Sequence, residues 1–184
     1  MIANQAARVS LAVMLAVVTA TACAREKPAP AAKEFAFGAR RVQVIVPEGW
    51  EALDQGNQKR FRKGEFAIVL QYLGPSTSLR PGPSAPPPRD LDALLDWGLA
   101  ELGAEIGPDK RRELKSRRSV TIDGREAFDI ETWNRLDHTN PQRIFFVKDD
   151  GDLLALHTER MAFEDTLAAF DAIRDSLHFV TAPR

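Results

Sequence analysis

Two short runs that are apolar at every position limit the folds open to this chain more than any other feature. They are residues 144–147 (Ile-Phe-Phe-Val) and residues 153–156 (Leu-Leu-Ala-Leu), with Asp150-Gly151 between them. Asp-Gly between two strand-like runs favours a β-hairpin with a tight turn. Side chains alternate between the two faces of a strand, so these strands require apolar cover on both faces of their sheet.

Further turn signals predict that the sheet is antiparallel. Residues 42–46 have valine at alternate positions and end at Pro47, which is typical of a strand. Hairpins pair consecutive strands in antiparallel fashion. The other hairpin signals are Lys63-Gly64 between residues 59–62 and 65–73, and Asp123-Gly124 within residues 119–134.

Two segments carry apolar side chains at helical spacing and supply the cover. Asp90 can cap the first helix, and acidic residues open the second, where the helix dipole favours them. The predicted fold is therefore α/β (α+β), a three-layer α/β/α sandwich around an antiparallel sheet of about six strands. The apolar stripes are Leu91, Leu94, Leu95, Leu99 and Leu102 in the first helix, and Phe163, Leu167, Phe170, Ile173 and Leu177 in the second.

The first 22 residues have the layout of a bacterial secretory signal peptide. Arg8 precedes an apolar run of about ten residues, too short for a membrane-spanning helix of about 20 residues. The single cysteine of the chain, Cys23, follows the small residues that end at Ala22. Residues 20–23 (Ala-Thr-Ala-Cys) resemble the bacterial lipobox, although Ala20 stands where leucine is usual. The resemblance implies cleavage before Cys23 and a lipid on that residue; the alternative is a secreted protein cut by the ordinary signal peptidase.

A lipid on Cys23 would anchor the protein in the cell envelope. The next residue is Ala24 and not aspartate, which favours the periplasmic face of the outer membrane. Residues 23–38 are predicted to be the lipidated cysteine and a flexible tether, because they begin with a polar, proline-containing stretch without apolar periodicity. Residues 39–184 then form a single domain, interrupted by a proline-rich loop at residues 74–89.

Two short motifs resemble PsbP-like (Mog1/PsbP) domains. Residues 44–50 (Val-Ile-Val-Pro-Glu-Gly-Trp) are similar to the family's early strand and turn, and residues 170–179 are similar to its closing helix. The resemblance covers roughly residues 35–181 and implies an α/β/α sandwich with an antiparallel sheet. It also implies an accessory, assembly or binding role, often on an exported lipoprotein. Residues 35–38 replace the family's aromatic stretch only in part, the proline-rich insertion is extra, and no functional residue of the family is matched.

The sequence contains no recognisable catalytic motif or metal-binding motif. His138, His157 and His178 are not spaced as metal ligands, so structural or surface roles are predicted for them. Residues 149–152 (Asp-Asp-Gly-Asp) do not match a calcium-binding EF-hand loop and are interpreted as a turn. A net charge of −1 argues against a nucleic-acid partner. We therefore predict no enzyme activity and no cofactor or metal, while a triad assembled from distant Ser, His and Asp residues stays open.

The densest charge cluster lies at residues 109–118. Its cations suit anionic lipid headgroups or an acidic partner, and they also suit a solvated strand edge that they protect from aggregation. Trp133 is predicted on the polar side of its strand and becomes a candidate contact residue if it is exposed. The candidate contacts are therefore Lys110, Arg111, Arg112, Lys115, Arg117, Arg118 and Trp133.

These features favour a non-catalytic cell-envelope lipoprotein that binds a protein partner or helps a complex assemble. The first alternative is a carrier or sensor of a small molecule or lipid, which an apolar pocket of several hundred Å³ would favour. The second alternative is a hydrolase with a dispersed site, which a cleft holding Ser, His and Asp residues with shifted pKa values would favour.

Overall fold

The computed structural model describes residues 31–74, 91–102, 106, 110–136, 138, 141–159 and 164–180. The predicted signal peptide, Cys23, the first half of the predicted tether, Asp90, Phe163 and the proline-rich loop beyond Gly74 lie outside these residues. Within the described residues, none of the helices combines the length and hydropathy needed to cross a membrane.

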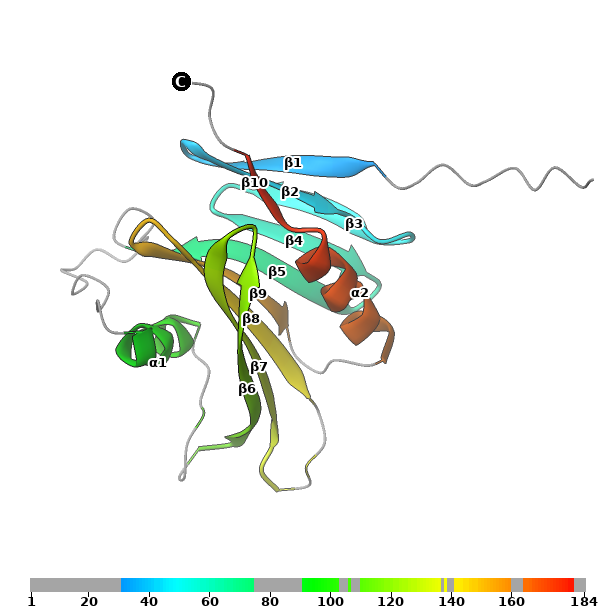
Figure 1. Cartoon of the computed structure of the whole chain (residues 1–184). Coiled ribbons are helices and arrows are strands. Elements are labelled where there is room, and N and C mark those ends of the chain that lie inside the picture. Colours follow the sequence, from blue (N-terminus) through cyan, green and yellow to red (C-terminus); the bar gives the residue numbers. More distant parts are fainter. Residues whose placement is uncertain are drawn as a thin grey trace, which may run out of the picture.

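The described residues form ten strands and two helices (Figure 1). In chain order these elements are β1 (Ala32–Phe37), β2 (Arg40–Ile45), β3 (Glu51–Gln55), β4 (Gln58–Lys63), β5 (Phe66–Leu73), α1 (Leu91–Glu101), β6 (Arg112–Ile122), β7 (Arg125–Asn134), β8 (Gln142–Asp149), β9 (Asp152–Glu159), α2 (Glu164–Asp175) and β10 (His178–Val180).

The strands form two antiparallel sheets in the described part of the chain, where the sequence predicts one sheet of about six strands. The larger sheet has seven strands in the order β3-β4-β5-β9-β8-β7-β6. The smaller sheet has the order β1-β2-β10. Strands β1, β3 and β10 are not predicted from the sequence: β3 is mostly polar, β10 has three residues, and β1 follows directly on the polar, proline-containing stretch.

The ordered domain begins earlier than residue 39. β1 pairs with β2 along its whole length, and its Phe35 and Phe37 side chains are buried. These two phenylalanines alternate with exposed residues, which is the pattern of a strand with one buried face. Residues 32–37 are therefore part of the fold, which corrects the predicted tether range of 23–38.

The three hairpins predicted from glycine turns are confirmed. Gly64 lies in the turn between β4 and β5, and the other two turns join β6 to β7 and β8 to β9. Both residues of the Asp123-Gly124 turn have positive φ angles, 49° and 75°, and so do Asp150 and Gly151, at 47° and 86°. Two consecutive positive φ angles match the right-handed twist of the flanking strands, which is why Asp-Gly suits such turns.

The larger sheet is covered on both faces, as the apolar runs in β8 and β9 require. Phe145 and Val147 point to one face and belong to a core cluster with α2 and the smaller sheet. Ile144 and Phe146 point to the other face and pack in a second cluster with α1. Each large apolar side chain that is fully buried contributes roughly 1.5–3 kcal/mol. The two helices therefore lie on opposite faces of the seven-stranded sheet (Figure 1).

Candidate interaction surface

The predicted basic cluster lies on and just before β6, the terminal strand of the seven-stranded sheet. Among the described strands, β6 pairs only with β7. Lys115 is the extra residue of a bulge between Leu114 and Ser116, and Ile106 forms an isolated bridge with Arg112. Figure 1 shows the open end of the β6–β7 hairpin, opposite to its Asp123-Gly124 turn, extending beyond both helices.

Three of the cations on β6 are paired with acids. The Lys115 Nζ atom lies 2.6 Å from an oxygen of Glu131. Arg117 pairs with Asp92 of α1, and Arg118 lies 3.6 Å from a carboxylate oxygen of Asp129. Exposed ion pairs such as Lys115–Glu131 and Arg117–Asp92 contribute little to stability. Arg112 instead donates a hydrogen bond of 3.4 Å to the Thr132 hydroxyl.

The other two cations, Lys110 and Arg111, are exposed and make no ion pair with a described carboxylate. They line an open cleft of about 470 Å³ at the end of the hairpin. The Arg135 amide donates to the Arg111 carbonyl at 2.9 Å, which joins the two sides of the cleft. Three cations and no acid are among its described lining residues, which are Lys110, Arg111, Asn134, Arg135 and Leu136.

The largest exposed apolar side chains of the described residues gather on the same hairpin. Leu136, at the cleft, is 93% exposed, and Leu114 and Val120 on β6 are 49% and 39% exposed. Sequence reasoning did not single out these three residues, because a lone leucine or valine in a strand gives no sign of its exposure. Leu114 and Leu136 lie with Lys110 and Arg111 at the open end of the hairpin, whereas Val120 lies near its turn and on the opposite face of the sheet from Leu114.

Trp133 is half-buried and held in place. Its indole Nε1 donates a 2.6 Å hydrogen bond to Glu113, and the ring stacks on His138 with centroids 4.7 Å apart. The His138 Nε2 atom also lies 2.9 Å from Glu113, and the Lys115 Nζ atom lies 5.3 Å from the indole centroid. The structure therefore places Trp133 beside the basic cluster, as a supporting side chain with an exposed edge.

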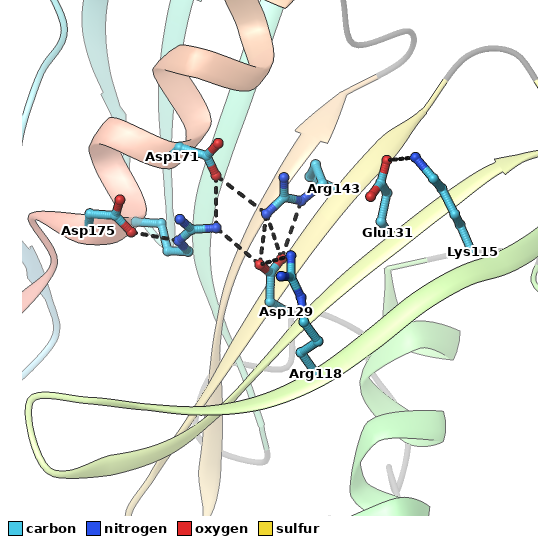
Figure 2. Close-up of polar contacts among 8 residues, drawn as sticks. Lys115, Arg118, Asp129, Glu131, Arg143, Asp171 and Asp175 are labelled. Carbon is cyan, nitrogen blue, oxygen red and sulfur yellow. Dashed lines mark hydrogen bonds and ion pairs between the residues drawn. The ribbon is translucent and has the colours of Figure 1, made fainter.

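A buried carboxylate ties this hairpin to α2 (Figure 2). Asp129 of β7 is 6% exposed, and both of its oxygens lie 2.8 Å from Nη2 of Arg143 on β8. The Arg174 Nη1 atom on α2 approaches at 3.0 Å. Arg174 also lies 2.8 Å from Asp171 and 2.7 Å from Asp175.

The acids around Arg174 keep it charged. Burial lowers the pKa of Arg174, but the hydrogen bond to Asp175 and the charges of Asp171, Asp175 and Asp129 outweigh burial and raise that pKa. Asp129 is surrounded by three arginines when Arg118 is included. The sequence predicts Asp129 on a polar side of β7, whereas that side faces α2 and is buried.

An open hollow of about 420 Å³ lies beside this ion cluster. Its walls come from β6, β7, β8 and α2, so it lies between the edge strand and the closing helix. Arg118, Val120 and Ile122 of β6 line one side, and Asp129 and Arg174 line another. The side chain of Val120 is therefore reachable from the α2 side of the sheet as well as from its edge.

The comparisons with known proteins report on fold alone. No family model matches the chain, and no curated protein matches it. The structure is similar to that of cyanobacterial PsbP (CyanoP) from Synechocystis, with a TM-score of 0.48, 16% identity, and coverage of 76% of this chain and 86% of that one. A protein of unknown function from Pseudomonas aeruginosa, PA94, is similar with a TM-score of 0.42 and 12% identity, over 83% of this chain and 97% of that one.

A third similar structure comes from Bacteroides thetaiotaomicron, with a TM-score of 0.44 and 8% identity. The match covers 76% of this chain and 45% of that one. The structural matches thus include a PsbP-like protein, the family that the sequence motifs resemble, at low sequence identity.

Replacing Asp129 by asparagine should destabilise the protein strongly. The change removes the more buried of the two acids that Arg143 and Arg174 share and leaves them the more exposed Asp171. Losing one partner of a buried ion pair costs about 3–5 kcal/mol. The free energy of unfolding from urea titration measures the loss. The matched control is Asp175→Asn, whose side chain is 66% exposed and whose loss should cost less than about 1 kcal/mol. Equal losses in the two variants would contradict a central role for Asp129.

Proposed function

We propose that this protein is a non-catalytic accessory protein of the bacterial cell envelope that binds an acidic protein partner through the β6–β7 hairpin. The observation that carries the proposal is the gathering of exposed apolar side chains among cations on this one hairpin. We name the region the β6–β7 surface; it lies at the open end of the hairpin and consists of Lys110, Arg111, Leu114, Arg135 and Leu136.

The composition of the β6–β7 surface suits protein recognition. Exposed apolar patches rimmed by polar residues are typical of interaction sites, and arginine is enriched where binding energy concentrates. Leu136 is almost fully exposed beside Lys110 and Arg111. Water contact with Leu136 is unfavourable in the free protein, so burial of this side chain by a partner would favour binding.

The charge of the cleft favours an acidic partner. Its described lining contains three cations and no carboxylate, although the whole chain has a net charge of −1. A local positive potential raises the rate at which acidic groups arrive and sets their orientation. Specificity would then come from the partner's apolar side chains, which must fit against Leu114 and Leu136.

Side-chain contacts along the hairpin also hold the β6–β7 surface in place. Trp133 is fixed by Glu113 and by stacking on His138, and Arg118 is drawn toward Asp129. Side chains that are already ordered lose less entropy on binding than free ones. The buried ion cluster and the indole therefore prepare the hairpin for a rigid contact.

The membrane anchor is the second part of the proposal. Cys23 lies outside the described residues, and the support for its lipidation is the lipobox-like sequence that precedes it. Stable anchoring requires more than one acyl chain, which a bacterial lipoprotein carries. The proposed location is the periplasmic face of the outer membrane, where a short tether would keep the domain close to the bilayer.

Mass spectrometry of the protein purified from its native membranes tests the anchor. The expected N-terminal peptide begins at Cys23 and carries the mass of the diacylglycerol thioether and of any N-acyl chain. A Cys23→Ser variant should leave the membrane fraction while the domain stays folded. A free thiol at Cys23, or an intact leader, would refute the lipoprotein assignment and leave the β6–β7 proposal to be tested by itself.

Site-specific photo-crosslinking in intact cells tests the protein partner. A photoreactive phenylalanine analogue at Leu136 or Leu114 of the full chain should give a discrete protein adduct. The same analogue at Asp165 of α2, whose side chain is 79% exposed, is the matched control and should give none. Combining the probe with Lys110→Glu and Arg111→Glu should abolish the adduct because the charge complementarity is reversed. Equal adducts at all sites, or adducts to phospholipid alone, would contradict a protein partner.

A further inference from the structure

The half of β6 nearest its turn is an open sheet edge with a high preference for strand structure. Residues 119–122 read Ser-Val-Thr-Ile, and three of these four residues are β-branched. Ser119 and Thr121 are exposed, and Val120 is 39% exposed. Along this half, β6 pairs with β7 on one side and with no described strand on the other. Exposed edges of this kind are templates for pairing with a further strand.

The features that normally prevent such pairing lie in the other half of the strand. Natural proteins protect sheet edges with charged side chains, proline and β-bulges. In β6 the bulge falls between Leu114 and Ser116, and the last of its cations is Arg118. From Ser116 to Ile122 the register with β7 is continuous, and no residue of the strand after Arg118 is charged or a proline. The edge is therefore unprotected where it approaches the turn.

Backbone groups on this edge are available to another chain. The closing pair of the hairpin, Ile122 and Arg125, flanks a two-residue turn in which both φ angles are positive. In such a hairpin the closing pair exchanges both of its backbone hydrogen bonds, and bonded and non-bonded pairs then alternate along the ladder. Every second residue therefore directs its N–H and C=O groups away from β7. Near the turn these residues are Arg117, Ser119 and Thr121, and no described residue bonds to their outward backbone groups.

The side chains between them lie on the α2 side of the sheet, where they line the open hollow of about 420 Å³; they are Arg118, Val120 and Ile122. The Arg118 side chain is 67% exposed, and its guanidinium lies 3.6 Å from Asp129 (Figure 2). Two other arginines hold Asp129 more closely, at 2.8 and 3.0 Å. Arg118 is therefore an accessible cation that can pair with an acid from outside the chain.

The charges along this edge decide which kind of strand suits it. Arg117, on the α1 side, is already paired with Asp92. β6 has no acidic residue between Leu114 and Ile122, so a second copy of the strand would bring further arginines to this edge and no acid. Like charges on neighbouring strands are unfavourable, and opposite charges are favourable. The strand that fits is therefore one from a different protein, with an acidic side chain placed beside Arg118.

We propose that residues 117–122 of β6 bind an extended segment of a partner protein, which adds to the sheet as an antiparallel strand like every other pair in it. The main chain of the segment bonds to the outward backbone groups of β6. One apolar side chain packs on Val120 beside the hollow, and an acidic side chain two residues away pairs with Arg118. In this mode the main chain provides affinity and alternate side chains provide specificity.

The inference deepens the proposed function, because it gives the form in which an acidic partner is recognised. It rests on that function only for the identity of the partner, since the edge can be tested with a peptide alone. Residues 117–122 also lie outside the β6–β7 surface at the open end of the hairpin. Failure of one site therefore leaves the other to be tested by itself.

Nuclear magnetic resonance titration of the mature chain in detergent tests strand addition. The probe is the blocked peptide Ile-Thr-Val-Thr-Glu-Thr, whose residues lie opposite 122 to 117 in an antiparallel pair, and the comparison peptide has lysine in place of glutamate. The first peptide should shift the Ser119 and Thr121 amides saturably and slow their exchange. The second should bind roughly three- to tenfold more weakly. No saturable shift at tens of millimolar, equal affinities, or dimerisation through β6 without peptide would overturn the proposal.

Two variants separate strand addition from a general effect on folding. Ser119→Pro removes an N–H that points away from β7, a place where an edge strand tolerates proline, so it should abolish peptide binding with little change in urea stability. Arg118→Glu should reverse the preference toward the lysine peptide. The double change Lys110→Glu and Arg111→Glu should alter peptide affinity less than about twofold. An unchanged preference in Arg118→Glu, or full binding by folded Ser119→Pro, would refute the site.

Discussion

Burial of both faces of the β8–β9 hairpin is the constraint from which the rest of the structure follows. Phe145, Phe146, Leu154 and Leu156 are all no more than 1% exposed, although neighbouring positions point to opposite sides of the sheet. Each face therefore needs its own cover, and α1 lies on one while α2 and the smaller sheet lie on the other. The described elements leave the β6 edge without a neighbouring strand, and the proposed interaction surface lies on that side of the sheet.

Asp129 connects this core to the proposed interaction surface. One carboxylate on β7 accepts from Arg143 of β8 and Arg174 of α2, and it lies near Arg118 on the edge strand. A buried ion cluster contributes little net stability compared with an apolar core, but its geometry is demanding. We therefore interpret it as the feature that fixes α2 against the sheet and orients the hairpin, while the apolar clusters supply the free energy of folding.

The sequence predicts the fold well where local chemistry determines structure. Asp-Gly turns specify their own φ angles, so the hairpins at Asp123 and Asp150 could be read directly. The fully apolar runs in β8 and β9 predict cover on both faces, which the two helices provide. By contrast, β10 has three residues and is stabilised by pairing with β2, a long-range contact that no local pattern reveals. The alternation of Phe35 and Phe37 before Gly38 is a local signal for β1 that the predicted tether range overlooks.

The candidate sites were predicted less completely, for the same reason. The basic cluster is visible in the sequence, and the structure places it on an edge strand. The exposure of Leu136 and the partners of Asp129 depend on residues far apart in the chain. Trp133 is predicted on the polar side of its strand, and the structure places it on the same side as Asp129 and Glu131, where Glu113 and His138 hold it half-buried.

If the protein acts through the β6 edge, a partner should cover that edge in the native membrane. Hydrogen–deuterium exchange of the lipid-anchored protein measures this, in isolated native membranes and again after purification in detergent. The amides of β6 and of residues 134–136 should exchange more slowly in the membranes. Those of β3, the opposite edge of the same sheet, should not change. Equal exchange of β6 in both preparations, or equal protection of β3 and β6, would contradict the account.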